Sequence, residues 1–159
     1  MTSQRPERRI GLHFRDEDAA VAEIETLRRC YDKAGNWSLA QACFHLHESL
    51  SSRMKSGPFP PNTPEQDARR DQLQQILASG RLPDGIEAPP NMQPAPDCGE
   101  VCIGAAVATL KKFKTFPGPI APHRLFGHLS DVDARRINLI HFAHHLSYLV
   151  PRDEVERRR

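Results

Sequence analysis

Prolines decide where this chain can be helical. The 159 residues include 14 prolines, concentrated in a few stretches. Residues 56–63 hold three of them and residues 81–97 hold five. No helix runs through such a stretch, because proline lacks an amide hydrogen and its ring collides with the preceding turn. A Pro-Gly-Pro break at 117–119 and the proline at 151 confine helices to four long stretches and one shorter one.

Apolar residues in the first two stretches recur at the three- and four-residue spacing of an amphipathic helix. This spacing predicts one helix from Asp16 to about Lys33, stopped by Gly35. It predicts a second helix from about Trp37 to Met54. Three consecutive acidic residues begin the first helix, where they favour the positive end of its dipole.

A shorter helix is predicted inside the proline-rich connection. Thr63, followed by a proline and a glutamate, is typical of a helix start. The segment from there to about Ser79 is highly charged and has few apolar positions. We therefore expect this helix to pack on the outside, within a crossover that continues in extended form through residues 81–97.

Two more long helices are predicted after the crossover. Asp97 and Glu100 have the spacing of a capping box ahead of a helix that ends at the Pro-Gly-Pro break. Ser130 and Asp133 have the same spacing at the start of a last helix, which reaches about Val150. The predicted fold class is all-α: a four-helix bundle with a long proline-rich crossover carrying one extra short helix.

The chain is predicted to form one domain with two short extensions. We expect a flexible N-terminal arm at 1–15, the bundle domain at 16–150 and a basic C-terminal tail at 151–159. The arginines near the two ends are expected to be solvated: Arg5, Arg8, Arg9, Arg157, Arg158 and Arg159.

Composition argues against several classes of partner. The formal net charge of +2 is too mild for a nucleic-acid binder, which carries concentrated basic patches. No stretch approaches the ~20 apolar residues that a membrane span needs, and the first ten residues lack the apolar core of a secretory signal. We therefore expect a cytoplasmic protein that binds neither nucleic acid nor membrane. The chain also lacks a glycine-rich phosphate loop and a nucleophile elbow.

The four cysteines fall inside predicted helices, two of them four residues apart, which is unlike the disulfide framework of a small secreted domain. Cys30, Cys43, Cys98 and Cys102 are therefore expected to be reduced and structural. An alternative interpretation makes Cys98 and Cys102 a redox or metal site, since thiolates are stabilised at a helix start.

Two histidines in the last predicted helix have the spacing of metal ligands. His141 and His145 are four residues apart, so they lie one turn apart on the same helix face. Zinc proteases of the His-Glu-x-x-His type present two imidazoles in this way. Here phenylalanine follows His141, so the general base of those proteases is missing.

A third histidine occupies an equivalent place on the second predicted helix. At about 100° per residue, His141 and His145 lie roughly 90–100° from the middle of their apolar stripe. His45 lies at a similar angle from the stripe of its own helix, whereas His47 points away. On both helices, histidine thus lies at the border of the buried apolar face. This arrangement predicts a metal in the cleft between the two helices.

Neighbouring polar residues leave alternatives for the details of this site. His144 is a candidate fourth ligand or acid/base, and a ligand pair of His141 with His144 is an open alternative to the four-residue spacing. Glu48 is a further catalytic candidate. Glu48 and Gln41, one turn either side of His45, are also candidates to hold its second ring nitrogen.

Two parts of the chain resemble motifs of a known superfamily. Residues 36–46 (Asn-Trp-Ser-Leu-Ala-Gln-Ala-Cys-Phe-His-Leu) resemble the second-helix motif of the DinB-like (YfiT-like) metalloenzyme superfamily. Residues 126–131 (Phe-Gly-His-Leu-Ser-Asp) and 140–146 (Ile-His-Phe-Ala-His-His-Leu) resemble the last-helix motif of one branch, an uncharacterised DinB-like domain family. The proline-rich insertions depart from the family pattern, so the substrates of relatives are not carried over.

The resemblance implies a four-helix bundle, often a homodimer, that binds one divalent metal. The implied ligands are His45 from the second helix and His141 and His145 from the last. Characterised members include thiol-dependent transferases and a maleylpyruvate isomerase, which use low-molecular-weight thiol cofactors. A small-molecule substrate and thiol transfer are therefore implied for this chain.

Three neutral imidazoles leave at least one coordination position open, which is typical of a catalytic rather than a structural metal site. We expect a metal-dependent transferase or hydrolase, with zinc chosen on abundance and nickel, manganese or iron as alternatives that imidazole also accepts. The alternative function is a non-catalytic helical bundle that binds a metal or a ligand.

Overall fold

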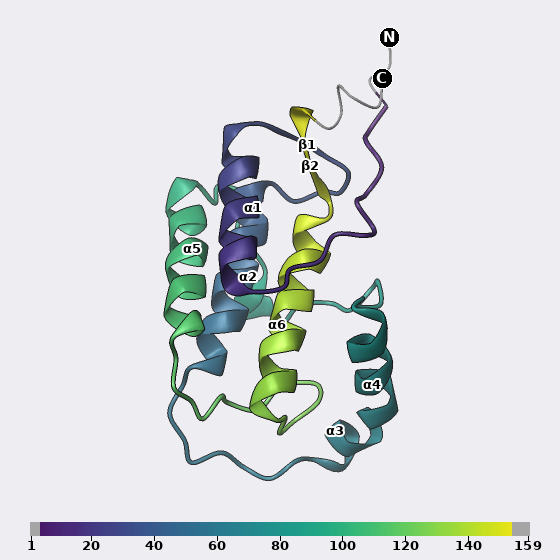
Figure 1. The fold of residues 1–159 in the computed structure, drawn as a ribbon, viewed down its shortest axis with the longest axis vertical. Helices are drawn as coiled ribbons and strands as arrows, with labels where there is room; N and C mark the ends of the chain where they lie inside the picture. The colour runs from purple at the N-terminus through teal and green to yellow at the C-terminus, as the bar shows by residue number, and fades with distance from the viewer. Residues whose placement is uncertain (1–3, 154–159) are drawn as a thin grey trace.

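The computed structural model describes residues 4–153 and confirms the all-α class. Four long helices form a bundle (Figure 1): α1 (Glu17–Arg29), α2 (Leu39–Arg53), α5 (Glu100–Lys114) and α6 (Asp131–Leu146). The crossover between α2 and α5 carries three short elements: α3 (Pro64–Ala68), α4 (Arg70–Ser79) and the 3₁₀ turn η1 (Pro90–Met92). No helix in this part of the chain is both long enough and apolar enough to cross a membrane.

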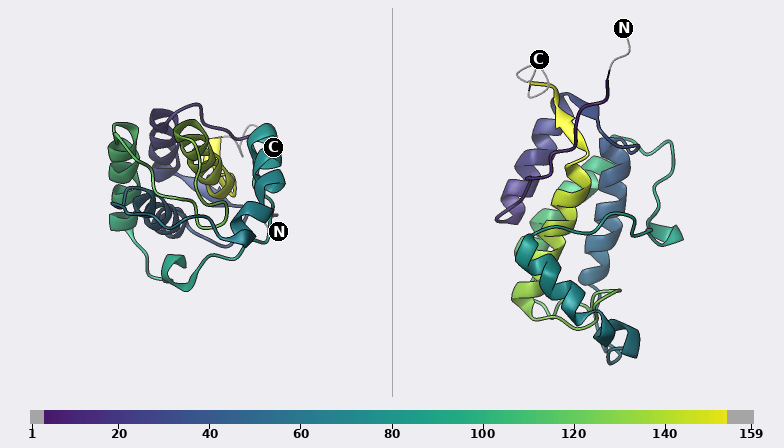
Figure 2. Two further views of the ribbon diagram at one scale, coloured as in Figure 1. Left: turned by 90° about the horizontal axis from the view of Figure 1, so that it is seen from below. Right: turned by 90° about the vertical axis from the view of Figure 1, so that its right-hand side faces the viewer.

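The order of the helices around the bundle places α2 beside α6. α1 and α6 run in one direction, and α2 and α5 run in the other (Figure 1). α5 packs against α1 and α2, and α6 packs against the same two helices from the opposite side. α2 and α6 are therefore antiparallel neighbours, and the crossover passes over the face that they form (Figure 2, right).

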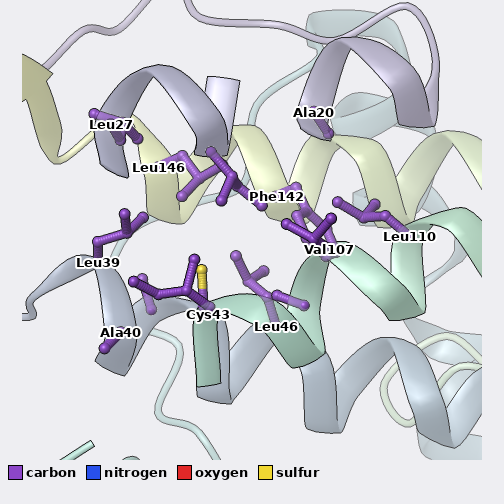
Figure 3. Close-up of a cluster of buried hydrophobic side chains, with 14 of the residues drawn as sticks. Ala20, Leu27, Leu39, Ala40, Cys43, Leu46, Val107, Leu110, Phe142 and Leu146 are labelled. Atoms are coloured by element: carbon purple, nitrogen blue, oxygen red, sulfur yellow. The ribbon is translucent and has the colours of Figure 1, made fainter. Parts of the chain in front are cut away.

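Buried apolar side chains from all four long helices meet in one core (Figure 3). Leu46 of α2, Leu110 of α5 and Leu146 of α6 are at most 1% exposed. Burying a leucine side chain contributes roughly 1.5–3 kcal/mol, so this packing is the main source of stability. As predicted, the short helix packs on the outside: Leu73 and Ile76 of α4 pack against α6 in a second, smaller cluster.

The ends of the first and last helices differ from the prediction. Helix α1 stops at Arg29 and α6 at Leu146, and each is followed by a short strand, β1 (Tyr31–Lys33) or β2 (Leu149–Pro151). The strands pair antiparallel, with Tyr31 opposite Pro151. Helical spacing in the sequence continues past both ends, but pairing between distant segments satisfies the backbone there instead.

The structure bears out some of the predicted caps. The Ser130 hydroxyl accepts a hydrogen bond from the amide of Asp133 (3.1 Å), and Thr63 forms a capping box at the start of α3. The predicted capping box of Asp97 and Glu100 is wrong, because α5 begins at Glu100 and its N-cap is Gly99, with no side-chain cap.

The expectation of four reduced cysteines is also wrong for one pair. Cys98 lies just before α5 and is joined by a disulfide to Cys102 in its first turn, with their Cα atoms 6.4 Å apart. Cys30 and Cys43 are free thiols. Burial raises the pKa of Cys43 to about 12, so this thiol stays protonated and unreactive.

Two of the N-terminal arginines are held against the bundle, contrary to the expectation that they would be solvated. The amide of Arg9 donates to the carbonyl of Ser147 (2.9 Å), and its guanidinium forms an ion pair with Glu23. Arg8 donates to the Ser147 hydroxyl (2.7 Å) and stacks over the ring of Tyr148. The arginines predicted to be solvated at 157–159 lie outside the described residues.

Candidate metal centre

The site is formed where matching stripes of α2 and α6 face each other. His45, Ser49 and Arg53 are spaced four residues apart along α2, and His141 and His145 are spaced in the same way along α6. Residues four apart share a helix face. Because the two helices are antiparallel neighbours, the stripes come together in the cleft predicted from the sequence.

The three predicted ligands converge through the same ring nitrogen. The Nε2 atom of His141 lies 3.0 Å from Nε2 of His45 and 3.1 Å from Nε2 of His145. The ligand atoms of all three residues lie within 4.8 Å of one another. Four-residue spacing on α6 is thus the arrangement found, and His144 is outside this group.

These distances fit a shared metal ion. Zinc–nitrogen bonds of about 2.0–2.1 Å in tetrahedral geometry place two ligand nitrogens roughly 3.3 Å apart. The observed separations of 3.0 and 3.1 Å are close to this value. The fit is chemical as well, since neutral imidazole nitrogen is a common ligand for divalent transition metals.

A backbone carbonyl sets the tautomer of His45. Nδ1 of His45 lies 3.0 Å from the carbonyl oxygen of Met92 in η1. A carbonyl can only accept, so Nδ1 carries the proton and Nε2 presents its lone pair to the site. On α6, Nδ1 of His141 lies 3.4 Å from the hydroxyl of Ser49. The crossover, which carries Met92, therefore takes part in orienting the ring of His45.

The residues predicted to support His45 lie elsewhere. The side chain of Gln41 accepts a hydrogen bond from the amide of Ser38 and closes a capping box at the start of α2. Glu48 lies beside His47, 4.0 Å from its ring, and does not line the cavity described below. His47 points to α5, where its Nδ1 lies 2.6 Å from the hydroxyl of Thr109.

Burial keeps the three histidines in the form that binds metal. It is the largest cause lowering the pKa of His45, and it holds the pKa values of His141 and His145 well below 6.5. The neighbouring histidines lower the latter two further. Neutral imidazole is the ligand form, so the metal competes with few protons near neutral pH.

An indole ring just before α2 packs against two of the three histidines. The ring of Trp37 stacks on His145 with centroids 5.3 Å apart and planes at 21°, and it lies 5.3 Å from the ring of His45. This packing restricts the orientations of both imidazoles. Trp37 is also the one tryptophan of the chain, which makes it an optical reporter of the site.

The three histidines line a cavity of about 650 Å³. Its walls come from α2 and α6, and residues of the crossover and of the loop before α6 complete the lining. The apolar part of its lining includes Leu82, Ile86, Met92, Leu125, Phe126 and Ile137. A volume of 300–1,000 Å³ with a mainly apolar lining and a few polar groups is typical of a small-molecule site.

His144 borders the cavity without joining the three histidines. Its Nδ1 accepts a hydrogen bond from Arg8 (2.9 Å), so its proton lies on Nε2. Burial first, and then the charge of Arg8, lowers the pKa of His144 to about 4. Arg8 in turn donates to Asp84 of the crossover (2.9 Å), which also accepts from the hydroxyl of Tyr148.

Three basic or imidazole side chains of the cavity were not predicted from the sequence. Arg53, at the end of α2, and His123 and Arg124, in the loop before α6, line the cavity. The amide of Leu125 donates to Nδ1 of His123 (3.1 Å), and burial lowers the pKa of His123 to about 3. A signal existed only for Arg53, which continues the four-residue stripe of His45; the other two lie in a loop without periodicity.

Neither a curated protein nor a solved structure matches this chain. A family model does match, over residues 6–152, and its description is "Protein of unknown function (DUF1569)". This match covers far more than half of the 159 residues, and the family lies within the DinB-like superfamily indicated by the sequence motifs. The chain therefore belongs to the family of proteins of unknown function DUF1569.

Proposed function

We propose that this chain is a divalent-metal-dependent enzyme in which His45, His141 and His145 hold one metal ion at the wall of the cavity. The observation that carries the proposal is the convergence of the three Nε2 atoms at a cavity of small-molecule size. Three histidines leave a coordination position open to that cavity, as in catalytic zinc sites. A bound metal would supply a Lewis acid that lowers the pKa of a coordinated water or thiol.

The residues around the histidines support a transferase or hydrolase reaction. Residues of the crossover and apolar side chains form much of the cavity lining. Nε2–H of His144 and Nε2–H of His123 are neutral donors at its border, since each Nδ1 accepts a hydrogen bond. Thiol transfer with a low-molecular-weight thiol is the reaction class we propose, with zinc as the metal and nickel, manganese or iron as alternatives.

One observation favours the competing function, a bundle that binds a metal or ligand without catalysis. Among the described residues that line the cavity, Glu87 provides the only carboxylate, and its side chain is exposed. A general base of the usual carboxylate type is therefore missing beside the three histidines. Turnover that is lost on chelation and restored by metal would separate the enzyme from the non-catalytic bundle.

Metal binding is tested on protein purified without a histidine tag. We expect one metal ion per chain by elemental analysis, and quenching of Trp37 fluorescence when Co²⁺ is added to the metal-free protein. His141→Ala should lose both signals and keep its helical circular dichroism. His13→Ala, which removes an exposed histidine outside the cavity, is the control and should keep both. Full metal content in His141→Ala would refute the ligand assignment.

The state of assembly and the location of the protein are part of the same proposal. Following the resemblance, we propose a homodimer in the cytoplasm that acts on a small molecule and binds neither nucleic acid nor membrane. Sedimentation analysis of the metal-loaded protein measures the assembly directly.

A further inference from the structure

Arg53 lies in the same stripe as the metal ligand of α2. It is eight residues after His45, which places the two Cα atoms roughly 12 Å apart along the helix axis. Only 8% of its surface is exposed. Its side chain donates to the carbonyl of Pro122 and to the hydroxyl of Ser52 (2.9 Å from Nη2), so the guanidinium is held against the loop that encloses the cavity.

The buried charge of Arg53 has no counter-ion among the described residues. Its hydrogen-bond partners, Pro122 and Ser52, are both neutral, and they occupy three of the five guanidinium N–H groups. Burial and the nearby Arg124 lower the pKa of Arg53 to about 10, so it is still charged at neutral pH. A buried cation without an anionic partner is costly to keep in a fold.

The rest of the cavity wall strengthens the positive field. Arg124 is exposed and lines the same cavity, and its charge acts on His45 and Arg53. The positive charge of Arg53 also contributes to lowering the pKa of His141. Exposed Glu87 is the only acidic residue among the described lining residues. A pocket of this kind concentrates anions rather than neutral molecules or cations.

From these observations, and resting on the function proposed above, we propose that the substrate is a small amphipathic carboxylic acid. Its carboxylate binds the guanidinium of Arg53, with Arg124 at the entrance, and its reacting group lies at the three histidines. The two remaining N–H groups of Arg53 match the two oxygens of a carboxylate. The apolar body of the acid contacts apolar residues such as Met92, Phe126 and Ile137, which line the same cavity.

The anion subsite is tested first on metal-free protein, so that the result does not depend on the metal. Calorimetry compares hexanoate with hexanamide, which has the same shape and no charge. We expect hexanoate to bind at least about tenfold more tightly, the range of one charge-assisted hydrogen-bonded pair. Arg53→Gln should abolish the preference for hexanoate. Arg53→Lys keeps the positive charge but lacks the paired N–H donors of the planar guanidinium, so it should retain part of the preference.

The control is Arg136→Gln, which removes an exposed arginine of α6 that does not line the cavity. It should bind hexanoate like the wild type. Thermal melting establishes that each variant is folded; if Arg53→Gln does not fold, Arg53→Lys and the wild-type comparison decide. Equal binding of hexanoate and hexanamide by the wild type, or an undiminished preference in a folded Arg53 variant, would overturn the proposal.

A second measurement separates this inference from the proposed function. Co²⁺-loaded protein is titrated with ω-mercaptohexanoate and with the neutral ω-mercaptohexanol, and the cobalt absorption reports thiolate binding. We expect both thiols to perturb the spectrum and the acid to do so at roughly tenfold lower concentration. If no metal binds but hexanoate is still preferred, the proposed function fails and the carboxylate subsite stands.

Discussion

The lowered pKa of His123 makes the unfolding free energy of the metal-free protein depend on pH in a predictable way. Burial is the main cause that lowers the pKa of His123 from 6.5 to about 3, and the charges of Arg53 and Arg124 add to it. The charge of His123 also acts on His141 of α6, which faces the same cavity. Below pH 6.5 the unfolded chain therefore takes up a proton at this residue that the folded protein does not accept.

The size of this effect follows from the two pKa values. Between the two pKa values, each pH unit of acidification lowers the unfolding free energy of the protein by about 1.36 kcal/mol, because only the unfolded chain binds the proton. Acidification from pH 6.5 to pH 5 should therefore cost about 2 kcal/mol through His123 alone. The loss continues toward pH 3, where the folded protein begins to accept the proton.

The contribution is isolated with His123→Asn, which does not titrate. The asparagine side-chain oxygen can still accept the hydrogen bond that the amide of Leu125 donates to His123. Urea unfolding of both proteins is measured between pH 7 and pH 5 with chelator present. The buried metal-site histidines titrate in both proteins, so their effect cancels in the difference.

We expect the unfolding free energy of the wild type to fall about 2 kcal/mol more than that of His123→Asn over this range. If the unfolding free energies of the two proteins changed with pH in parallel, His123 would have an ordinary pKa. The argument that burial and nearby positive charges lower its pKa would then be wrong. A titration of the His123 ring by NMR provides an independent value of its pKa.

Three further predictions concern the core, the metal and the border of the cavity. Leu146→Ala should lower the unfolding free energy by about 2–5 kcal/mol, because Leu146 is fully buried, while the folded variant still binds metal in full; denaturation and elemental analysis measure both. Metal should dissociate only well below pH 6.5, because burial lowers the pKa of all three ligands; dialysis at a series of pH values tests this, and loss of metal already at pH 6.5 would contradict it. Arg8→Gln should raise the pKa of His144 above about 4, because a neighbouring positive charge is removed; NMR titration of the variant should detect the change.

The meeting of the three histidines could be predicted from the sequence because side chains recur at a fixed period along a helix. Side chains four residues apart share a face whatever the helix packs against. The apolar stripes of α2 and α6 had to face the core. Histidines at the borders of these stripes therefore had to lie at the same cleft once the two helices were neighbours. The same reasoning identified the outer position of α4, whose few apolar residues pack on α6.

The ends of the helices and the cysteine pair could not be assigned in this way. Helical spacing continues beyond Arg29 and Leu146, and only the pairing of β1 with β2, between segments far apart in the chain, ends the two helices there. The disulfide of Cys98 and Cys102 depends on where α5 begins. The sequence predicted an earlier start from a capping pattern that the folded chain does not use.

The local pattern of the sequence thus determined the bundle, its long crossover and the three histidines, because helix periodicity and proline breaks are properties of short segments. The tertiary structure decided how the cavity is enclosed. The carbonyl of Met92 reaches His45 only because the crossover passes over α2. The loop containing Pro122 and His123 turns Arg53, an ordinary charged residue at the end of a helix, into a buried cation. These contacts depend on the path of irregular segments, which no periodicity encodes.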